Sequence, residues 1–209
     1  MKPNITTLFL DVGGVLLTNG WDHLARQQAA TKFGLDSAEL EARHQLNFAT
    51  YEEGRLTLDA YLTRTVFYED RAFTRDQFRE FMFAQSQPIP GMIALFTELK
   101  REHGLKIAVV SNEARELNAY RIGQFKLGDF VDVFISSCFV RMRKPDTNIF
   151  QLALDITQPR PDQVVFIDNT LMFVQVAESM GMHGIHHTDY KTTCAALAEY
   201  GLQSAAAGS

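Results

Sequence analysis

The stretch TLFLDVGGVL, residues 7–16, combines a short apolar run with an acidic residue and two glycines. Continuous apolar runs of this length are typical of strands buried on both faces of a parallel sheet. Asp11 follows the run directly, and Gly13 and Gly14 then favour a turn. We therefore predict a buried strand that presents Asp11 where the strand ends.

Two later runs repeat this arrangement. Residues 106–110 precede Ser111, residues 164–167 precede Asp168, and residues 131–137 predict a neighbouring strand. Helical patterns lie between them, at residues 92–100 with a stop near Gly104 and at residues 171–180. Alternating strands and helices from residue 88 onward predict an α/β fold with a doubly wound parallel sheet.

The connections of such a sheet determine where its polar residues lie. Right-handed crossovers place the carboxyl ends of parallel strands on one edge, and ligands bind at that edge. We therefore expect Asp11, Ser111 and Asp168 to meet there.

Residues 17–87 differ from the rest of the chain, because their apolar pattern is helical and contains no strong strand candidate. The predicted helices are residues 21–33, 37–48, 58–66 and 75–84. A Pro/Gly cluster at residues 87–91 favours a hinge where the chain returns. We predict a catalytic core of residues 1–16 and 88–209 with an inserted all-helical cap of residues 17–87.

Composition limits the partners and the compartment. The chain has 209 residues, 46% hydrophobic and 22% charged, as in globular proteins. A net charge of −5 without a basic cluster argues against nucleic acid and anionic membranes as partners. The first apolar run is too short for a signal peptide, and no run approaches the ~20 residues of a membrane helix. We expect a cytoplasmic monomer or small homo-oligomer.

Four segments in order resemble the motifs of the haloacid-dehalogenase-like superfamily. They are LFLDVGGVL at residues 8–16, VVSN at 109–112, RKPD at 143–146 and VFIDN at 165–169. The four together span nearly the whole chain and are far more specific than any one alone. Within the superfamily the chain is most similar to small sugar-phosphatase-like enzymes with a helical cap on a Rossmann-like core.

This resemblance implies a role for each matching residue. Asp11 would be the nucleophile that forms an aspartyl-phosphate. Asp11, the carbonyl of Gly13 and Asp168 would hold Mg²⁺, which prefers hard oxygen ligands. The implied substrate is a small phosphorylated metabolite.

The remaining motif residues would bind the substrate. Lys144 would neutralise Asp11 and a phosphate oxygen, Ser111 would hold another oxygen, and Asn112 would hold the substrate or the phosphoryl group. Taken singly, each residue has a plainer explanation. Asp11 and Asp168 could cap turns or helices, and Lys144 could be a solvated surface lysine.

Two departures from the family pattern put efficient catalysis in doubt. Gly13 stands where phosphatases often carry a second aspartate, which acts as general acid and base and typically contributes about 10²–10⁴-fold. Asn169 replaces a frequent acidic residue, and Phe173 stands where Asn is common. We therefore expect weaker metal binding and a preference for leaving groups that need little protonation, unless a water or a cap residue supplies the proton.

Two other functions stay open. One is a 2-haloacid dehalogenase, in which Asp11 attacks carbon without a metal. The other is a catalytically weak metabolite-binding protein. The cap should choose the substrate, and its candidate residues, each of which could equally be a solvated or packing residue, are Arg43, His44, Asn47, Tyr51 and Arg55.

Overall fold

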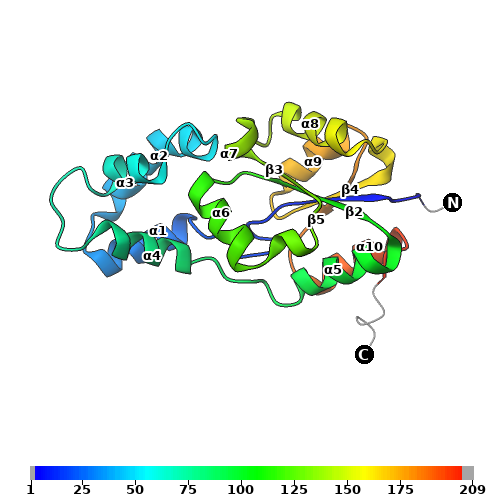
Figure 1. The fold of residues 1–209 in the computed structure, drawn as a ribbon, viewed down its shortest axis with the longest axis horizontal. Helices are drawn as coiled ribbons and strands as arrows, with labels where there is room; N and C mark the ends of the chain where they lie inside the picture. Colours follow the sequence, from blue (N-terminus) through cyan, green and yellow to red (C-terminus); the bar gives the residue numbers. More distant parts are fainter. Residues whose placement is uncertain (1–2, 204–209) are drawn as a thin grey trace.

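The computed structural model describes residues 3–203 and has a five-stranded parallel sheet at its centre (Figure 1). The strands are β1 (Thr7–Leu10), β2 (Lys106–Ser111), β3 (Val133–Ser136), β4 (Val164–Asp168) and β5 (His183–His186). Their order is β3-β2-β1-β4-β5, so the chain winds outward from β1 in both directions. The predicted doubly wound α/β fold is confirmed.

The register of the sheet brings three strand ends to one level. Leu10 of β1 pairs with Val109 of β2 and with Ile167 of β4. Asp11, directly after β1, and Asp168, the last residue of the neighbouring β4, therefore lie at the same height. Ser111, the last residue of β2, ends at the same edge.

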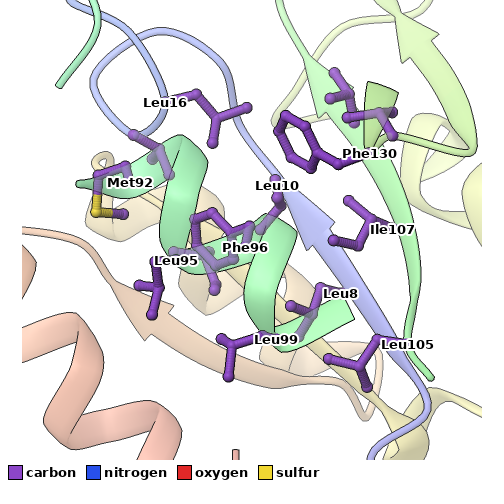
Figure 2. Packing of buried hydrophobic residues seen from close by; sticks show 14 of the residues in the cluster. Leu8, Leu10, Leu16, Met92, Leu95, Phe96, Leu99, Leu105, Ile107 and Phe130 are labelled. Carbon is purple, nitrogen blue, oxygen red and sulfur yellow. The ribbon is translucent and has the colours of Figure 1, made fainter. Parts of the chain in front are cut away.

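Helices cover both faces of the sheet. The helices on one face are α5 (Met92–His103) and α10 (Tyr190–Glu199), and those on the other are α8 (Thr147–Thr157) and α9 (Leu171–Ser179). Strand side chains alternate between the faces. Leu8 and Leu10 pack with Phe96 of α5 (Figure 2), whereas Phe9 packs with Phe150 of α8.

Four helices between β1 and α5 form a separate helical layer beside the sheet, which we call the helical body (Figure 1). They are α1 (His23–Phe33), α2 (Ser37–Glu52), α3 (Leu58–Thr65) and α4 (Arg75–Ala84). Each begins after an Asp or Thr whose side chain accepts a hydrogen bond from a backbone N–H of the first turn. Their core includes Tyr61, Phe78 and Met82, all fully buried.

Two chain crossings join the helical body to the sheet domain, and they lie side by side. The backbone N–H of Thr18 donates to Gln87 O at 2.8 Å, and the Thr18 hydroxyl donates to Gln85 O at 2.6 Å. Leu17 also bridges Pro88. The expected division into a core and a cap at residues 17 and 87 stays a prediction.

Some elements differ from the sequence-based expectation. Helix α2 runs to Glu52, beyond Phe48, and ends before Gly54, whose positive φ of 66° breaks the helix. The expected strand at residues 131–137 begins only at Val133, because the Asp132 side chain binds Lys100 and the Ile107 N–H. The chain then turns at once into the short helix α7 (Ser137–Val140).

The remaining elements are helix α6 (Arg115–Gln124) and the 3-10 turns η1 (Leu127–Asp129) and η2 (Pro161–Gln163). No helix within residues 3–203 is long and apolar enough to cross a membrane.

Candidate active site

Three of the predicted residues meet at the carboxyl edge of the sheet. The Lys144 ammonium lies 3.0 Å from Asp11 Oδ1 and 2.5 Å from Asp168 Oδ2. Lys144 and Asp168 are buried, and Asp11 keeps 8% of its surface exposed. Burial alone would lower the pKa of Lys144, but the two carboxylates raise it, so its ammonium stays charged.

Lys144 reaches this position because Asn112 holds its backbone. The Asn112 amide donates to Lys144 O at 2.9 Å, and its carbonyl accepts from Lys144 N at 2.8 Å. The rings of Phe166 and Phe173 lie 5.4 and 5.2 Å from the ammonium. Phe173, one of the departures from the family pattern, thus contacts the cation by its ring face. These contacts indicate that Asn112 positions the backbone of Lys144.

Asp168 is the fully buried acid of the group. Its Oδ1 accepts the Thr170 N–H at 2.7 Å, while Oδ2 accepts from Lys144. Burial, and then the charge of Asp11, raise its pKa to about 6. Asp11 and Asp168 therefore share one cation, and the single charge of Lys144 does not neutralise both carboxylates.

This donor set fits a small hard cation. Asp11 and Asp168 offer carboxylate oxygens, which Mg²⁺ prefers, and their mutual repulsion would be relieved by added positive charge. Within residues 3–203 no group of three or more His, Cys, Asp and Glu side chains is placed to hold a metal. The magnesium ion would therefore depend on two carboxylates, the Gly13 carbonyl and water.

Ser111 has an orphaned hydroxyl at the end of β2. Its side chain is 1% exposed, and its Oγ has no hydrogen-bond partner among the described residues. A buried hydroxyl without a partner costs free energy. Ser111 ends β2 at the same sheet edge as Asp11 and Asp168.

A cavity of about 370 Å³ lies between the sheet edge and the helical body. Its core side includes Asp11, Gly13, Asn112 and Asn169, and its helical side includes Trp21, His44, Phe48 and Tyr51. Asp11 is thus both paired with Lys144 and accessible from a space large enough for a small molecule.

The two departures near Asp11 have different consequences. A Cβ at Gly13 would have only ordinary contacts, at 3.6–3.7 Å from Asn19 and Arg121, so no steric requirement enforces glycine there. Asn169 lines the cavity and donates weakly to Asn19 Oδ1 at 3.4 Å. It can offer a carbonyl oxygen but no charge.

Two ion pairs at the cavity were not anticipated from the sequence. Glu113 and Arg121 form a buried pair, and burial raises the pKa of Glu113 to about 7. Glu52 of α2 accepts from Arg143, the neighbour of Lys144, at 2.6 and 3.0 Å. Glu113 could have been predicted as a site residue, because it lies only two positions after Ser111. Glu52 is far from every motif in the sequence and reaches the cavity only through the packing of α2.

The five cap candidates separate into two groups. His44 and Tyr51 line the cavity. Arg43, Asn47 and Arg55 do not: they pair with Glu39, with Arg64 and with Glu53 respectively. Trp21 also lines the cavity and was not singled out from the sequence.

Comparisons with known proteins show the family of the chain. A family model for haloacid dehalogenase-like hydrolases matches residues 5–181. The chain is 27% identical over 176 residues to the glyceraldehyde 3-phosphate phosphatase of Methanothermobacter thermautotrophicus, covering 79% of this chain and 77% of that protein. It is 30% identical over 112 residues to the sesquiterpene phosphatase astK of Aspergillus oryzae, covering 53% of this chain and only 56% of that protein.

A solved structure shows the same fold. The crystal structure of the HAD family enzyme bt-2542 from Bacteroides thetaiotaomicron, in complex with magnesium and inorganic phosphate, matches with a TM-score of 0.73 and 21% identity. The match covers 88% of this chain and 95% of that one. At this identity the likeness concerns the fold alone.

Proposed function

Because the chain belongs to the haloacid dehalogenase-like hydrolase family, we propose that it is a magnesium-dependent phosphatase that hydrolyses a phosphate monoester of a small metabolite. One observation carries the proposal: the Lys144 ammonium joins Asp11 and Asp168, and Asp11 opens onto a cavity. The arrangement combines a nucleophilic carboxylate, a fixed cation and a second carboxylate, as phosphoryl transfer requires.

The proposed reaction begins with attack by a carboxylate oxygen of Asp11 on phosphorus. A bond forms between that oxygen and phosphorus, the bond from phosphorus to the substrate oxygen breaks, and that oxygen takes a proton from water or a cavity residue and leaves as the alcohol. Water then attacks the phosphorus of the aspartyl-phosphate, which releases inorganic phosphate and restores Asp11. Lys144 pairs with Asp11 at 3.0 Å and places positive charge beside the transferring group.

Magnesium, held by Asp11, Asp168 and the Gly13 carbonyl, would supply charge stabilisation for the phosphoryl group. The Ser111 hydroxyl, which has no partner within the described part of the chain, donates to a phosphate oxygen. Asn112 keeps Lys144 in place through its backbone. Each of these residues lies at the same sheet edge.

Because residue 13, two positions after the nucleophile, is glycine, no aspartate there can donate a proton to the leaving oxygen. We expect faster turnover with leaving groups that need little protonation, such as an acyl group or an anomeric sugar oxygen, than with a simple alkyl alcohol. The source of a proton for poorer leaving groups is then water or a cavity residue.

The test is phosphate release from sugar phosphates, nucleotides and acyl phosphates, with and without Mg²⁺. Asp11→Asn should abolish release, because the amide is a poor nucleophile. Asp70→Asn, at an exposed loop position, is the matched control and should retain activity. Metal-independent release, or chloride release from a 2-haloacid without Mg²⁺, would contradict the proposal.

A further inference from the structure

An alkyl leaving group needs a proton, and the structure shows what borders the position of the missing donor. A Cβ at Gly13 would lie 3.7 Å from Arg121 Nη1, so a side chain at residue 13 would border this guanidinium group. The same nitrogen donates a hydrogen bond to Glu113 Oε1. The carboxyl group of Glu113 is therefore one hydrogen bond away from a group that a side chain at position 13 would contact.

Glu113 reaches the cavity from the loop between β2 and α6. It lines that cavity together with Asp11, and its backbone N–H donates to Ser137 Oγ at 2.9 Å. Arg121 binds Oε1 of Glu113. Oε2 accepts no hydrogen bond within residues 3–203, yet it is not one of the enclosed polar atoms without a partner in that part of the chain. Because 3% of the residue is still exposed, Oε2 is accessible from the cavity.

The surroundings of Glu113 give it a proton to donate. Burial raises its pKa to about 7, the charge of Arg121 opposes that rise, and the charges of Asp11 and Glu52 add to it. About half of the Glu113 side chains then carry a proton at neutral pH, which suits a general acid. Once the proton has left, the carboxylate forms an ion pair with Arg121. Arg121 therefore stabilises the ionised form that proton donation leaves behind.

Other polar groups near the site are less suited to this role. Asp22 caps α1 through its side chain. Burial lowers the pKa of His44 to about 4, so its ring is neutral and a weak acid at pH 7. Burial raises the pKa of Tyr51 well above its ordinary value, and its hydroxyl is enclosed. Cys138 is fully buried, and burial raises its pKa to about 12. The last three groups hold no readily donated proton at neutral pH.

Glu52 is a rival carboxyl group on the α2 side of the cavity, and burial raises its pKa as well. Its carboxylate accepts two hydrogen bonds from Arg143, at 2.6 and 3.0 Å. The atoms nearest to a Cβ at Gly13 belong to Asn19 and Arg121. Since Arg121 binds Glu113, the position of the missing donor is closer to Glu113 than to any group bound to Glu52 among these contacts.

We propose that Glu113 donates the proton to the leaving oxygen, in place of the acid that is absent at position 13, and later removes a proton from the attacking water. This inference rests on the proposed phosphatase function and deepens it. As the bond from phosphorus to the substrate oxygen breaks, its electron pair stays on that oxygen, which takes the Glu113 proton and leaves as the alcohol.

The second half of the reaction returns the proton to Glu113. A water oxygen bonds to the phosphorus of the aspartyl-phosphate while Glu113 takes one proton of that water. The bond from phosphorus to the Asp11 oxygen breaks, and its electron pair returns to the Asp11 carboxylate. Inorganic phosphate leaves, and Glu113 is protonated again for the next substrate.

The first test compares two leaving groups in the variant Glu113→Gln, which keeps an oxygen for Arg121 but has no acidic proton. For glycerol 3-phosphate, whose alkoxide needs a proton, kcat/KM should fall about 10²-fold. For acetyl phosphate, whose acetate needs none, the loss should be smaller by a factor of about ten or more. Glu80→Gln, at an exposed position of α4, is the matched control. Equal losses on both substrates would overturn the inference.

The wild-type protein supplies a test that does not depend on how well a variant folds. Because Glu113 donates only while it is protonated, kcat/KM for glycerol 3-phosphate is highest below its pKa of about 7 and should fall as the pH rises through that value, roughly tenfold per pH unit. The value for acetyl phosphate should not fall in this range. The same alkaline fall for both substrates, or none for glycerol 3-phosphate, would contradict the inference.

A third test restores a donor at position 13. If Gly13→Asp and Glu113 do the same work, their effects are not additive. Adding Gly13→Asp should therefore raise kcat/KM for glycerol 3-phosphate by a larger factor in the Glu113→Gln background than in the wild-type protein. An equal factor in the two backgrounds would show that Glu113 is not the donor.

These experiments separate the inference from the proposed function. If the wild-type chain releases phosphate from neither substrate in Mg²⁺, the phosphatase proposal fails and the role of Glu113 fails with it. If the wild-type chain hydrolyses both substrates but the loss selective for glycerol 3-phosphate appears in Glu52→Gln instead of Glu113→Gln, the phosphatase proposal stands and the inference is wrong.

Discussion

Replacement of Lys144 by methionine tests the charge arrangement on which the site depends. In the wild-type protein the Lys144 ammonium lies 3.0 Å from Asp11 Oδ1 and 2.5 Å from Asp168 Oδ2. At an effective dielectric constant of about 20, each pair is worth roughly 5–7 kcal/mol of Coulomb energy before desolvation is subtracted. Removing one partner of a buried pair typically costs about 3–5 kcal/mol, because the remaining charge is left uncompensated. We expect Lys144→Met to lose that much free energy of unfolding in EDTA.

The assay is guanidinium denaturation at pH 7, with and without Mg²⁺. Magnesium should restore part of the lost stability, since it supplies positive charge to the same two carboxylates. The double variant Lys144→Met, Asp168→Asn should recover stability in EDTA, because one of the two facing charges is gone. Lys191→Met, at an exposed position of α10, should change the free energy of unfolding by less than about 0.5 kcal/mol. A Lys144→Met protein as stable as wild type in EDTA would refute the reasoning.

Three other measurements address separate parts of the site. Because the pKa of Asp168 is raised to about 6, protons compete with the metal below that pH, and calorimetry should find Mg²⁺ binding about tenfold weaker at pH 5 than at pH 7.5. Gly13→Asp has room for its Cβ and should raise kcat on glycerol 3-phosphate by about tenfold or more without raising it on acetyl phosphate; an equal effect on both would argue against a leaving-group role. Gly20→Ala would place a Cβ 1.7 Å from Arg121 Nη2, at a φ of +73°. It should lower the free energy of unfolding by roughly 1–3 kcal/mol in a denaturation experiment. An unchanged midpoint would show that Arg121 can move away.

The part of the fold that was predictable is the part in which local pattern and burial agree. The run Thr7–Leu10 is mostly apolar, is buried on both faces and lies in the middle of the sheet, so its sequence and its environment carry the same information. Gly104 ends α5 with a φ of 64°, as the position of a glycine after an amphipathic helix predicts. Helix α8 was not placed from the sequence, although its residues alternate between buried and exposed with helical period.

The candidate site divides in a similar way. Asp11, Ser111 and Asp168 end strands, and the topology of a parallel sheet is enough to bring them to one edge. Glu52 and Arg121 could not be placed by such reasoning. Both lie on helices whose orientation depends on how the helical body packs against the sheet domain, and a single sequence gives little information about that packing.

Arg121 shows why that packing and the chemistry of the site depend on each other. Its guanidinium donates to Ser86 Oγ at 3.0 Å and to Asn19 O at 2.9 Å, so one side chain of α6 binds both chain crossings to the helical body. A buried arginine is tolerated only when its charge is paired, and Glu113, on the cavity wall, supplies that charge. The Arg121–Glu113 ion pair therefore holds the two chain crossings together and also neutralises two charged residues of the cavity wall. It follows that the position of the helical body over Asp11 and the neutralised charge of Arg121 on the cavity wall have one structural cause, so a variant that frees the Arg121 charge should alter both.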